Sequence, residues 1–158
     1  MDESLPAPSI LSRDNGASIA YHFTPGKHPG VLFMTGFKSD MTGDKALALE
    51  EFCRMRGNAF LRFDYQGHGQ SSGDFNEGTI GEWLSDAIDA LDQLTDGPQV
   101  LVGSSMGGWM MLLVARARPQ RIAGLLGLAS APDFTEDLIQ AELSDAQKAE
   151  LNTNGVVS

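Results

Sequence analysis

The sequence predicts an α/β fold in which helices cover both faces of a mostly parallel sheet. Short apolar runs that suit buried strands alternate along the chain with longer amphipathic or apolar stretches that suit helices. Many of the 18 glycines stand where one kind of run gives way to the next. Because strands that alternate with helices pair in parallel through right-handed crossovers, we expect a functional site at the carboxyl ends of the strands.

The elements follow from local patterns. Apolar runs predict buried strands at 30–34, 59–63, 100–102 and 122–129, and an alternating pattern predicts an edge strand at 17–23. Helical spacing of apolar residues predicts helices at 44–56, 79–94 and 107–118 and helix-prone structure at 132–151. Gly57 is a good residue to end the first helix, and Thr79 with Glu82 fits a capping box at the start of the second.

Size and composition fit one globular domain. The chain has 158 residues, against roughly 100–200 for a typical domain, and 42% of them are hydrophobic. Its formal net charge of -10 disfavours nucleic acid and anionic membrane surfaces as partners. No apolar run is long enough for a membrane span, and the first six residues lack the positive charge of a targeting leader. We therefore expect a cytoplasmic protein.

Metal and disulfide chemistry is disfavoured as well. Cys53 is the single cysteine, which excludes an internal disulfide or a cysteine-based zinc cluster. The histidines, His22, His28 and His68, lack the spacing of metal ligands. We expect no metal and no cofactor.

The strongest chemical signal is a Gly-x-Ser-x-Gly sequence at residues 103–107, between a predicted strand and a predicted helix. In this context the turn is so sharp that side chains at Gly103 and Gly107 would collide with the neighbouring elements. The turn holds the hydroxyl of Ser105 out at the end of the sheet, at the positive end of the next helix. The Met106 N–H then points to where an oxyanion would form. Ser104 fits only the variable position.

A second oxyanion donor is expected in the loop after the 30–34 strand, where the backbone N–H of Phe37 follows Gly36. The alternative is a turn glycine followed by a core aromatic residue. Asp64 and His68, in the glycine-rich loop after the 59–63 strand, look like a catalytic pair. The usual behaviour of such loops instead predicts that Asp64 accepts backbone hydrogen bonds and that His68 is a variable position between turn glycines.

Three segments, 33–37, 62–71 and 103–109, resemble the α/β-hydrolase superfamily in their order and spacing. Within it, residues 45–53 and 96–102 are similar to bacterial relatives of the mitochondrial abhydrolase-domain palmitoyl-protein thioesterases, also described as acyl-glucuronide esterases. The likeness runs from about Gly16 to the last residue. It implies a serine hydrolase of ester or thioester bonds that acts on a small-molecule or acylated substrate. Ser105 would be the nucleophile, and Phe37 and Met106 the oxyanion donors.

The triad histidine has no counterpart in these residues. In that superfamily the acid and the histidine follow the serine, but no histidine follows Ser105. Such enzymes commonly have roughly 200–250 residues. We therefore expect an N-terminal part of a hydrolase, inactive by itself, with the core at 1–131 and the start of a helical cap or a connecting segment at 132–158. Asp133, just after the predicted 122–129 strand, is a weaker candidate for the triad acid, since some hydrolases place the acid after this strand.

Two other interpretations stay open. A non-catalytic binding protein on the hydrolase scaffold is favoured by the missing histidine. A nucleotide-dependent oxidoreductase would also use a parallel sheet with glycine-rich turns, and residues 67–73 superficially suit one. However, the third glycine of that loop is one place too far along, and Asp74 and Glu77 stand where a pyrophosphate would need a helix N-terminus.

Overall fold

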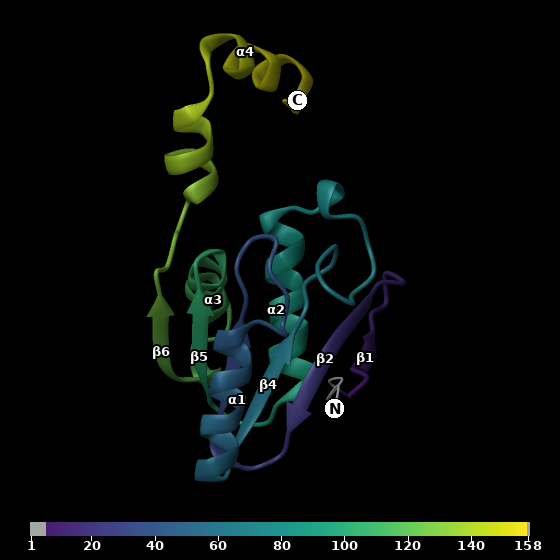
Figure 1. The fold of residues 1–158 in the computed structure, drawn as a ribbon, viewed down its shortest axis with the longest axis vertical. Coiled ribbons are helices and arrows are strands. Elements are labelled where there is room, and N and C mark those ends of the chain that lie inside the picture. The colour runs from purple at the N-terminus through teal and green to yellow at the C-terminus, as the bar shows by residue number, and fades with distance from the viewer. Residues whose placement is uncertain (1–5, 158) are drawn as a thin grey trace.

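A computed structural model describes residues 6–157, and six strands among them form one sheet in the order β1-β2-β4-β3-β5-β6 (Figure 1). β3 pairs in parallel with β4 and β5, and β5 pairs in parallel with β6, whereas β1 and β2 are antiparallel additions beside β4. The predicted mostly parallel sheet is therefore confirmed. The strands are β1 (Ser9–Ser12), β2 (Ser18–Thr24), β3 (Lys27–Met34), β4 (Asn58–Phe63), β5 (Gln99–Ser104) and β6 (Ile122–Leu128).

Helices cover both faces of the sheet, as predicted. In Figure 1, α1 lies in front of the sheet and α2 and α3 lie behind it. The helices are α1 (Asp44–Arg56), α2 (Ile80–Leu94), α3 (Met106–Ala117) and α4 (Asp145–Asn154), with short helical turns η1 (Phe75–Glu77), η2 (Pro119–Arg121) and η3 (Thr135–Gln140), the last of π type.

Local sequence sets the helix ends. Thr79 precedes α2 and forms the predicted capping box: its hydroxyl accepts the Glu82 N–H, and its own N–H donates to the Glu82 carboxylate. Gly57 ends α1 with a φ of 73°, a left-handed conformation that glycine adopts without a side-chain clash.

The alternation of side chains along β3 divides the core between the two faces. Leu32 and Met34 are buried with α2 and α3 in the larger apolar cluster. Phe33 points to the other face, where it packs in a smaller cluster with Ala46 and Cys53 of α1. Burial raises the pKa of the Cys53 thiol, which suits an unreactive core residue.

Two parts of the chain differ from the prediction. β1 was not expected, because its four residues are mostly exposed and carry little apolar periodicity. The helix-prone stretch 132–151 divides into η3 and α4, because Ser144 forms a capping box with Gln147 and starts a new helix. This segment extends beyond the end of the sheet in Figure 1. Residues 1–5 and 158 lie outside the described residues, although the expected domain boundaries include them. Most of the first six residues, which were expected to lack a targeting leader, therefore lie outside the described residues as well.

Candidate active site

Ser105 forms the sharp turn between β5 and α3 that its sequence context predicts. Its backbone has a φ of 54° and a ψ of -120°, outside the regions that side-chain-bearing residues favour. The turn is held in place by the Ser105 N–H, which donates to the Leu128 carbonyl oxygen at 3.0 Å, and by the Ser105 carbonyl, which accepts the Gly108 N–H at 2.9 Å. Ser105 is exposed at the N-terminus of α3.

The two glycines of the motif are required by close backbone approach. A Cβ at Gly103 would collide with the Gly107 carbonyl, and a Cβ at Gly107 would collide with the Met34 carbonyl. Both obstacles are backbone atoms that cannot rotate away. The spacing that identified the turn in the sequence is therefore a steric requirement of the fold.

The loop after β3 lies directly against the turn. A Cβ built on Gly36 would be 3.3 Å from the Ser105 Cβ and 3.8 Å from the Ser105 Oγ. Phe37 follows in the chain, and Met106 begins α3. Within residues 6–157, neither the Phe37 N–H nor the Met106 N–H donates a hydrogen bond to the protein. The structure thus brings the three residues singled out from the sequence, Ser105, Phe37 and Met106, to one place.

Asp64 acts as the predicted anchor of loops. Its carboxylate is fully buried and accepts the Met41 N–H at 2.7 Å and the Gln70 N–H at 2.9 Å. Burial raises the pKa of Asp64, and these two backbone hydrogen bonds oppose that shift. No hydrogen bond joins Asp64 to His68 within the described part of the chain.

His68 differs from its prediction as a variable turn position. Its side chain is buried and lies edge-on to the rings of Tyr65, Phe75 and Trp83, with centroid distances of 5.6, 5.2 and 5.1 Å. Its Nδ1 lies 3.1 Å from the Gln66 carbonyl oxygen and must therefore carry the ring proton. The glycines on either side hid this role, because they carry no apolar pattern.

An aromatic wall, defined as Phe37, Phe75, Trp83 and His68, therefore stands at the loop after β3. Phe37 contacts Phe75 at 4.9 Å and Trp83 at 6.0 Å between ring centroids, both edge-on. Phe134, just before η3, closes on Phe37 at 5.3 Å. Phe37 was identified from the sequence only through its backbone N–H, and the structure adds its ring as a packing group.

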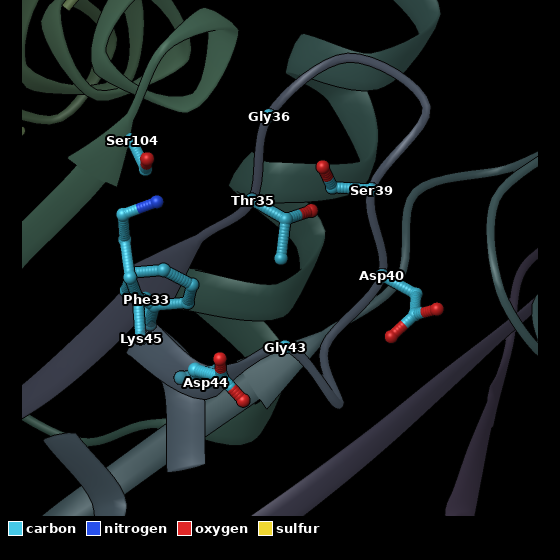
Figure 2. A pocket seen from close by; sticks show the side chains of 10 residues that line it. Phe33, Thr35, Gly36, Ser39, Asp40, Gly43, Asp44, Lys45 and Ser104 are labelled. Carbon is cyan, nitrogen blue, oxygen red and sulfur yellow. The ribbon is translucent and has the colours of Figure 1, made fainter. Parts of the chain in front are cut away.

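On the other side of the same loop is a cavity of about 180 Å³ between the end of β3 and the start of α1 (Figure 2). Ser104 and Lys45 line it, and Figure 2 shows the Lys45 side chain directed toward Ser104. Ser104 thus faces the α1 side of the sheet, whereas the next residue in the chain forms the exposed turn. This placement agrees with its interpretation as a small residue under the turn.

Asp133, the weaker candidate for an acid, lies in the loop that follows β6. It is exposed and has a φ of 53°, and its carbonyl accepts the first N–H groups of the π-helical turn. The same loop contacts the candidate nucleophile through the Ala131 N–H, which donates to the Ser105 carbonyl at 3.1 Å. No hydrogen bond joins the Asp133 carboxylate to another residue between 6 and 157.

The sheet order, the strained serine turn and the adjoining loop define an α/β hydrolase. The family model described as serine aminopeptidase, S33 matches residues 31–155, and the chain belongs to this family. The family match removes support from the oxidoreductase interpretation. The glycine-rich loop of that interpretation closes on itself, with the Gly67 N–H donating to the Ser72 carbonyl at 2.8 Å.

Curated relatives carry the name that the sequence resemblance suggested. The mitochondrial palmitoyl-protein thioesterase ABHD10 of Rattus norvegicus is 50% identical over 125 residues, which are 79% of this chain and 42% of the relative. The Homo sapiens protein of the same name is also 50% identical, over 79% of this chain and 41% of its own. The chain therefore spans about two fifths of the length of these relatives.

Solved structures agree. Mouse α/β-hydrolase domain-containing protein 10 superposes with a TM-score of 0.87 at 43% identity, covering 95% of this chain and 60% of the mouse chain. A hydrolase from Agrobacterium vitis gives a TM-score of 0.82 at 38% identity, covering 95% of this chain and 61% of its own. The predicted fold and branch of the superfamily are confirmed.

The expected cytoplasmic location is wrong. The curated thioesterase relatives are named as mitochondrial proteins, and composition alone could not show this, because location is set by targeting rather than by the fold. Across residues 6–157, no helix has the length and apolar character needed to cross a bilayer.

Proposed function

We propose that this chain carries the nucleophile and the oxyanion hole of a hydrolase that cleaves carboxylic ester or thioester bonds through an acyl-enzyme. The observation that carries the proposal is the strained, exposed turn at Ser105, with the free N–H groups of Phe37 and Met106 beside it. The thioester alternative is supported by the name of the curated relatives, and an acylated protein or small molecule is the class of substrate.

In the proposed reaction the Ser105 Oγ attacks the acyl carbon, and the carbonyl electron pair moves onto oxygen. The Phe37 and Met106 N–H groups then donate to this oxyanion, and the positive end of α3 stabilises its charge. Collapse of the intermediate expels the alcohol or thiol, which takes up a proton, and leaves the acyl group on Ser105. Water attacks the acyl-enzyme ester, which releases the acyl group as a carboxylic acid and regenerates the Ser105 hydroxyl.

The proton that leaves Ser105 needs a base. All three histidines precede Ser105 in the chain, whereas the α/β-hydrolase base follows the serine. We therefore propose that residues 1–131 belong to the hydrolase core, that 132–158 begin a cap or a connecting segment, and that this chain alone turns over slowly. Losing the base commonly costs about 10⁴–10⁶-fold in rate, while oxyanion stabilisation retains a residual effect.

The second candidate function is non-catalytic binding of an acylated ligand on the hydrolase scaffold, and the same absence of a following histidine favours it. The two candidates differ in one property. A nucleophile reacts covalently with an activated phosphonate, whereas a binding site does not.

The test is labelling of the 158-residue chain with a fluorophosphonate in the presence of imidazole, which supplies the base that the chain lacks, followed by peptide mass spectrometry. We expect the adduct on Ser105, its loss in Ser105→Ala, and its retention in the neighbouring control Ser104→Ala. Labelling that survives Ser105→Ala would refute the assignment, and no labelling at all would favour the binding protein.

Chemical rescue tests the missing base. Imidazole added to the solution should raise hydrolysis of a p-nitrophenyl ester by the wild type above that by Ser105→Ala, because it can accept the serine proton. Fast Ser105-dependent turnover without imidazole would show that the chain already holds a base.

A further inference from the structure

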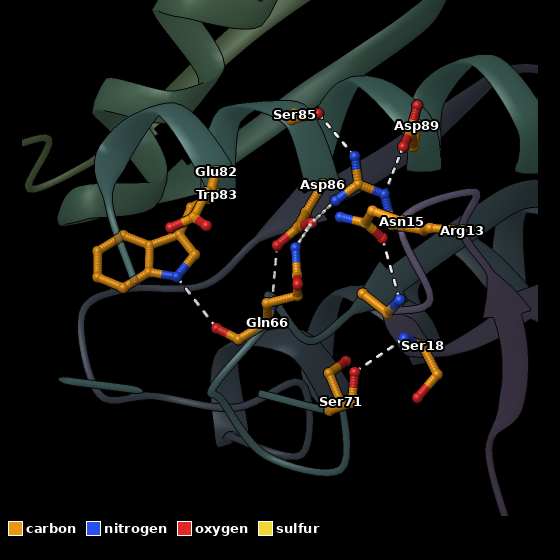
Figure 3. Close-up of polar contacts among 12 residues, drawn as sticks. Arg13, Asn15, Ser18, Gln66, Ser71, Glu82, Trp83, Ser85, Asp86 and Asp89 are labelled. Atoms are coloured by element: carbon orange, nitrogen blue, oxygen red, sulfur yellow. Dashed lines mark hydrogen bonds and ion pairs between the residues drawn. The ribbon is translucent and has the colours of Figure 1, made fainter. Parts of the chain in front are cut away.

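Asp86 lies on α2, and its fully buried carboxylate holds Gln66 in the loop after β4 (Figure 3). One carboxylate oxygen accepts the Gln66 backbone N–H at 2.8 Å, and the other accepts the Gln66 side-chain amide at 2.8 Å. The Arg13 guanidinium pairs with the same carboxylate from the loop between β1 and β2. Charge-assisted hydrogen bonds of this kind are about twice as strong as neutral ones, so Gln66 is held at both its backbone and its side chain.

The arginine is itself fixed. Its Nε donates to Asp89 at 2.6 Å, and a terminal nitrogen donates to the Ser85 hydroxyl at 2.6 Å. Figure 3 shows Ser85, Asp86 and Asp89 meeting Arg13 from one side of α2. The Asp86 carboxylate also accepts hydrogen bonds from Gln66, whereas Asp89 hydrogen-bonds only to Arg13 among residues 6–157.

Gln66 in turn forms hydrogen bonds with two residues of the aromatic wall. Its carbonyl oxygen accepts the Trp83 indole N–H at 3.0 Å and the His68 Nδ1–H at 3.1 Å. Trp83 is stacked on Phe75, with centroids 5.7 Å apart and an angle of 23° between the rings. Trp83 and Phe75 both contact Phe37 edge-on, as Phe134 also does.

We infer that Asp86 is a positioning residue for the oxyanion hole: through Gln66 it fixes the Trp83 and Phe75 rings against Phe37 and so sets the direction of the Phe37 N–H. The inference rests on the proposed function, since it assumes that the Phe37 N–H stabilises the oxyanion. Small displacements of such a donor matter, because oxyanion stabilisation depends on groups arranged before the reaction starts.

The test compares wild type, Asp86→Asn and the matched control Asp89→Asn, all as the 158-residue chain. Each is labelled with a fluorophosphonate in the presence of imidazole as the base, and nitrogen–proton NMR spectra are taken before and after labelling. In wild type and Asp89→Asn, we expect the Phe37 amide proton to move downfield on labelling as it donates to the phosphonyl oxygen. In Asp86→Asn we expect this movement to shrink and the labelling rate to fall roughly tenfold, less than the about 10²–10³-fold that follows loss of a whole donor.

Gln66→Leu is the replacement test variant if Asp86→Asn does not fold. It keeps the backbone hydrogen bond to Asp86 and removes only the side-chain one, so it should change the Phe37 signal and the rate in the same direction but less. A folded Asp86→Asn with the wild-type rate and the full Phe37 movement would overturn the inference. So would a folded Gln66→Leu with both unchanged.

If wild type does not label even with imidazole present, the proposed function fails and the inference is judged on unlabelled protein. The Trp83 indole and Phe37 amide signals should then move in Asp86→Asn and stay in place in Asp89→Asn. Unmoved signals in Asp86→Asn would refute positioning by Asp86.

Discussion

The Asp64 carboxylate accepts the Met41 N–H across 2.7 Å and so ties the loop after β4 to the loop that carries the candidate oxyanion donor. The same carboxylate accepts the Gln70 N–H from its own loop at 2.9 Å. Two loops that lie apart in the sequence thus share one buried anchor. The anchor is an ionisable group, which makes the arrangement sensitive to pH.

We expect the contribution of Asp64 to the free energy of unfolding to fall as pH rises. Burial raises its pKa above the ordinary value of 3.8, against the opposing hydrogen bonds from Gln70 and Met41. A carboxyl with a raised pKa in the folded state contributes stability that is fully present below the unfolded pKa and is lost as pH rises through the folded pKa. The free energy of unfolding of wild type minus that of Asp64→Asn should therefore fall as pH rises above the ordinary carboxyl pKa of 3.8, as measured by urea denaturation.

Glu51→Gln is the control with the opposite sign. The hydrogen bond from Arg54 lowers the pKa of Glu51, so any stabilisation by this group is present at neutral pH and lost as pH falls through its folded pKa. The corresponding difference for Glu51 should rise or stay flat over the same range. A difference for Asp64→Asn that rose with pH would contradict the expected sign.

Removing Glu50 should destabilise the protein strongly, because it would leave a buried cation unpaired. The Arg62 side chain is only 2% exposed, and its guanidinium pairs with Glu50 at 3.0 Å and donates to the Met41 carbonyl at 3.1 Å. Breaking a buried pair from one side commonly costs about 3–5 kcal/mol. We expect a loss of that order in Glu50→Ala, measured by denaturant unfolding, and partial recovery when Arg62→Met is added. A double variant less stable than Glu50→Ala would show that the unpaired cation is not the cause.

Gly107→Ala should damage both stability and the site. The added Cβ would meet the Met34 carbonyl, so β3 and α3 must separate at the candidate nucleophile. Overpacking of this kind typically costs about 1–3 kcal/mol, and more where backbone cannot move. The control is Gly81→Ala in the first turn of α2, where a Cβ meets only the Thr79 hydroxyl at 3.9 Å and should be neutral or add up to about 1 kcal/mol. Equal unfolding free energies for the two variants would contradict the steric account.

The sequence was most informative where one local segment determines the geometry. The turn at Ser105 could be predicted because the backbone that a side chain at Gly103 would meet is that of Gly107 and Gly108, in the same turn and helix. Thr79 likewise marks its helix start through contacts three residues away. Patterns of this range are visible without knowing the fold.

The supporting network could not be predicted in this way. Arg13 and Asp86 are 73 residues apart, and Gln66 and Asp86 are 20 apart, so only the folded sheet brings them together. The burial of His68 also depends on the fold, since its aromatic neighbours come from its own loop, from η1 and from α2. The sequence does not distinguish one polar loop residue from another, because their roles depend on the partners that the fold brings next to them.

The outer edge of β6 should make the 158-residue chain self-associate. β6 pairs with β5 on one side, and among residues 6–157 no strand covers its other side. Leu125 and Leu126 in this strand are 46% and 48% exposed. An apolar strand edge with free N–H and C=O groups is a template for pairing with a second copy of the same chain, and natural edge strands often carry lysine, which prevents such pairing.

We expect oligomers in sedimentation velocity and a shift toward monomer in Leu126→Lys. We expect no shift in the control Met55→Lys, which adds the same charge to a 76% exposed position on α1. A 16.9 kDa monomer that is monodisperse at high concentration and unfolds in one cooperative transition would show that this edge does not drive association.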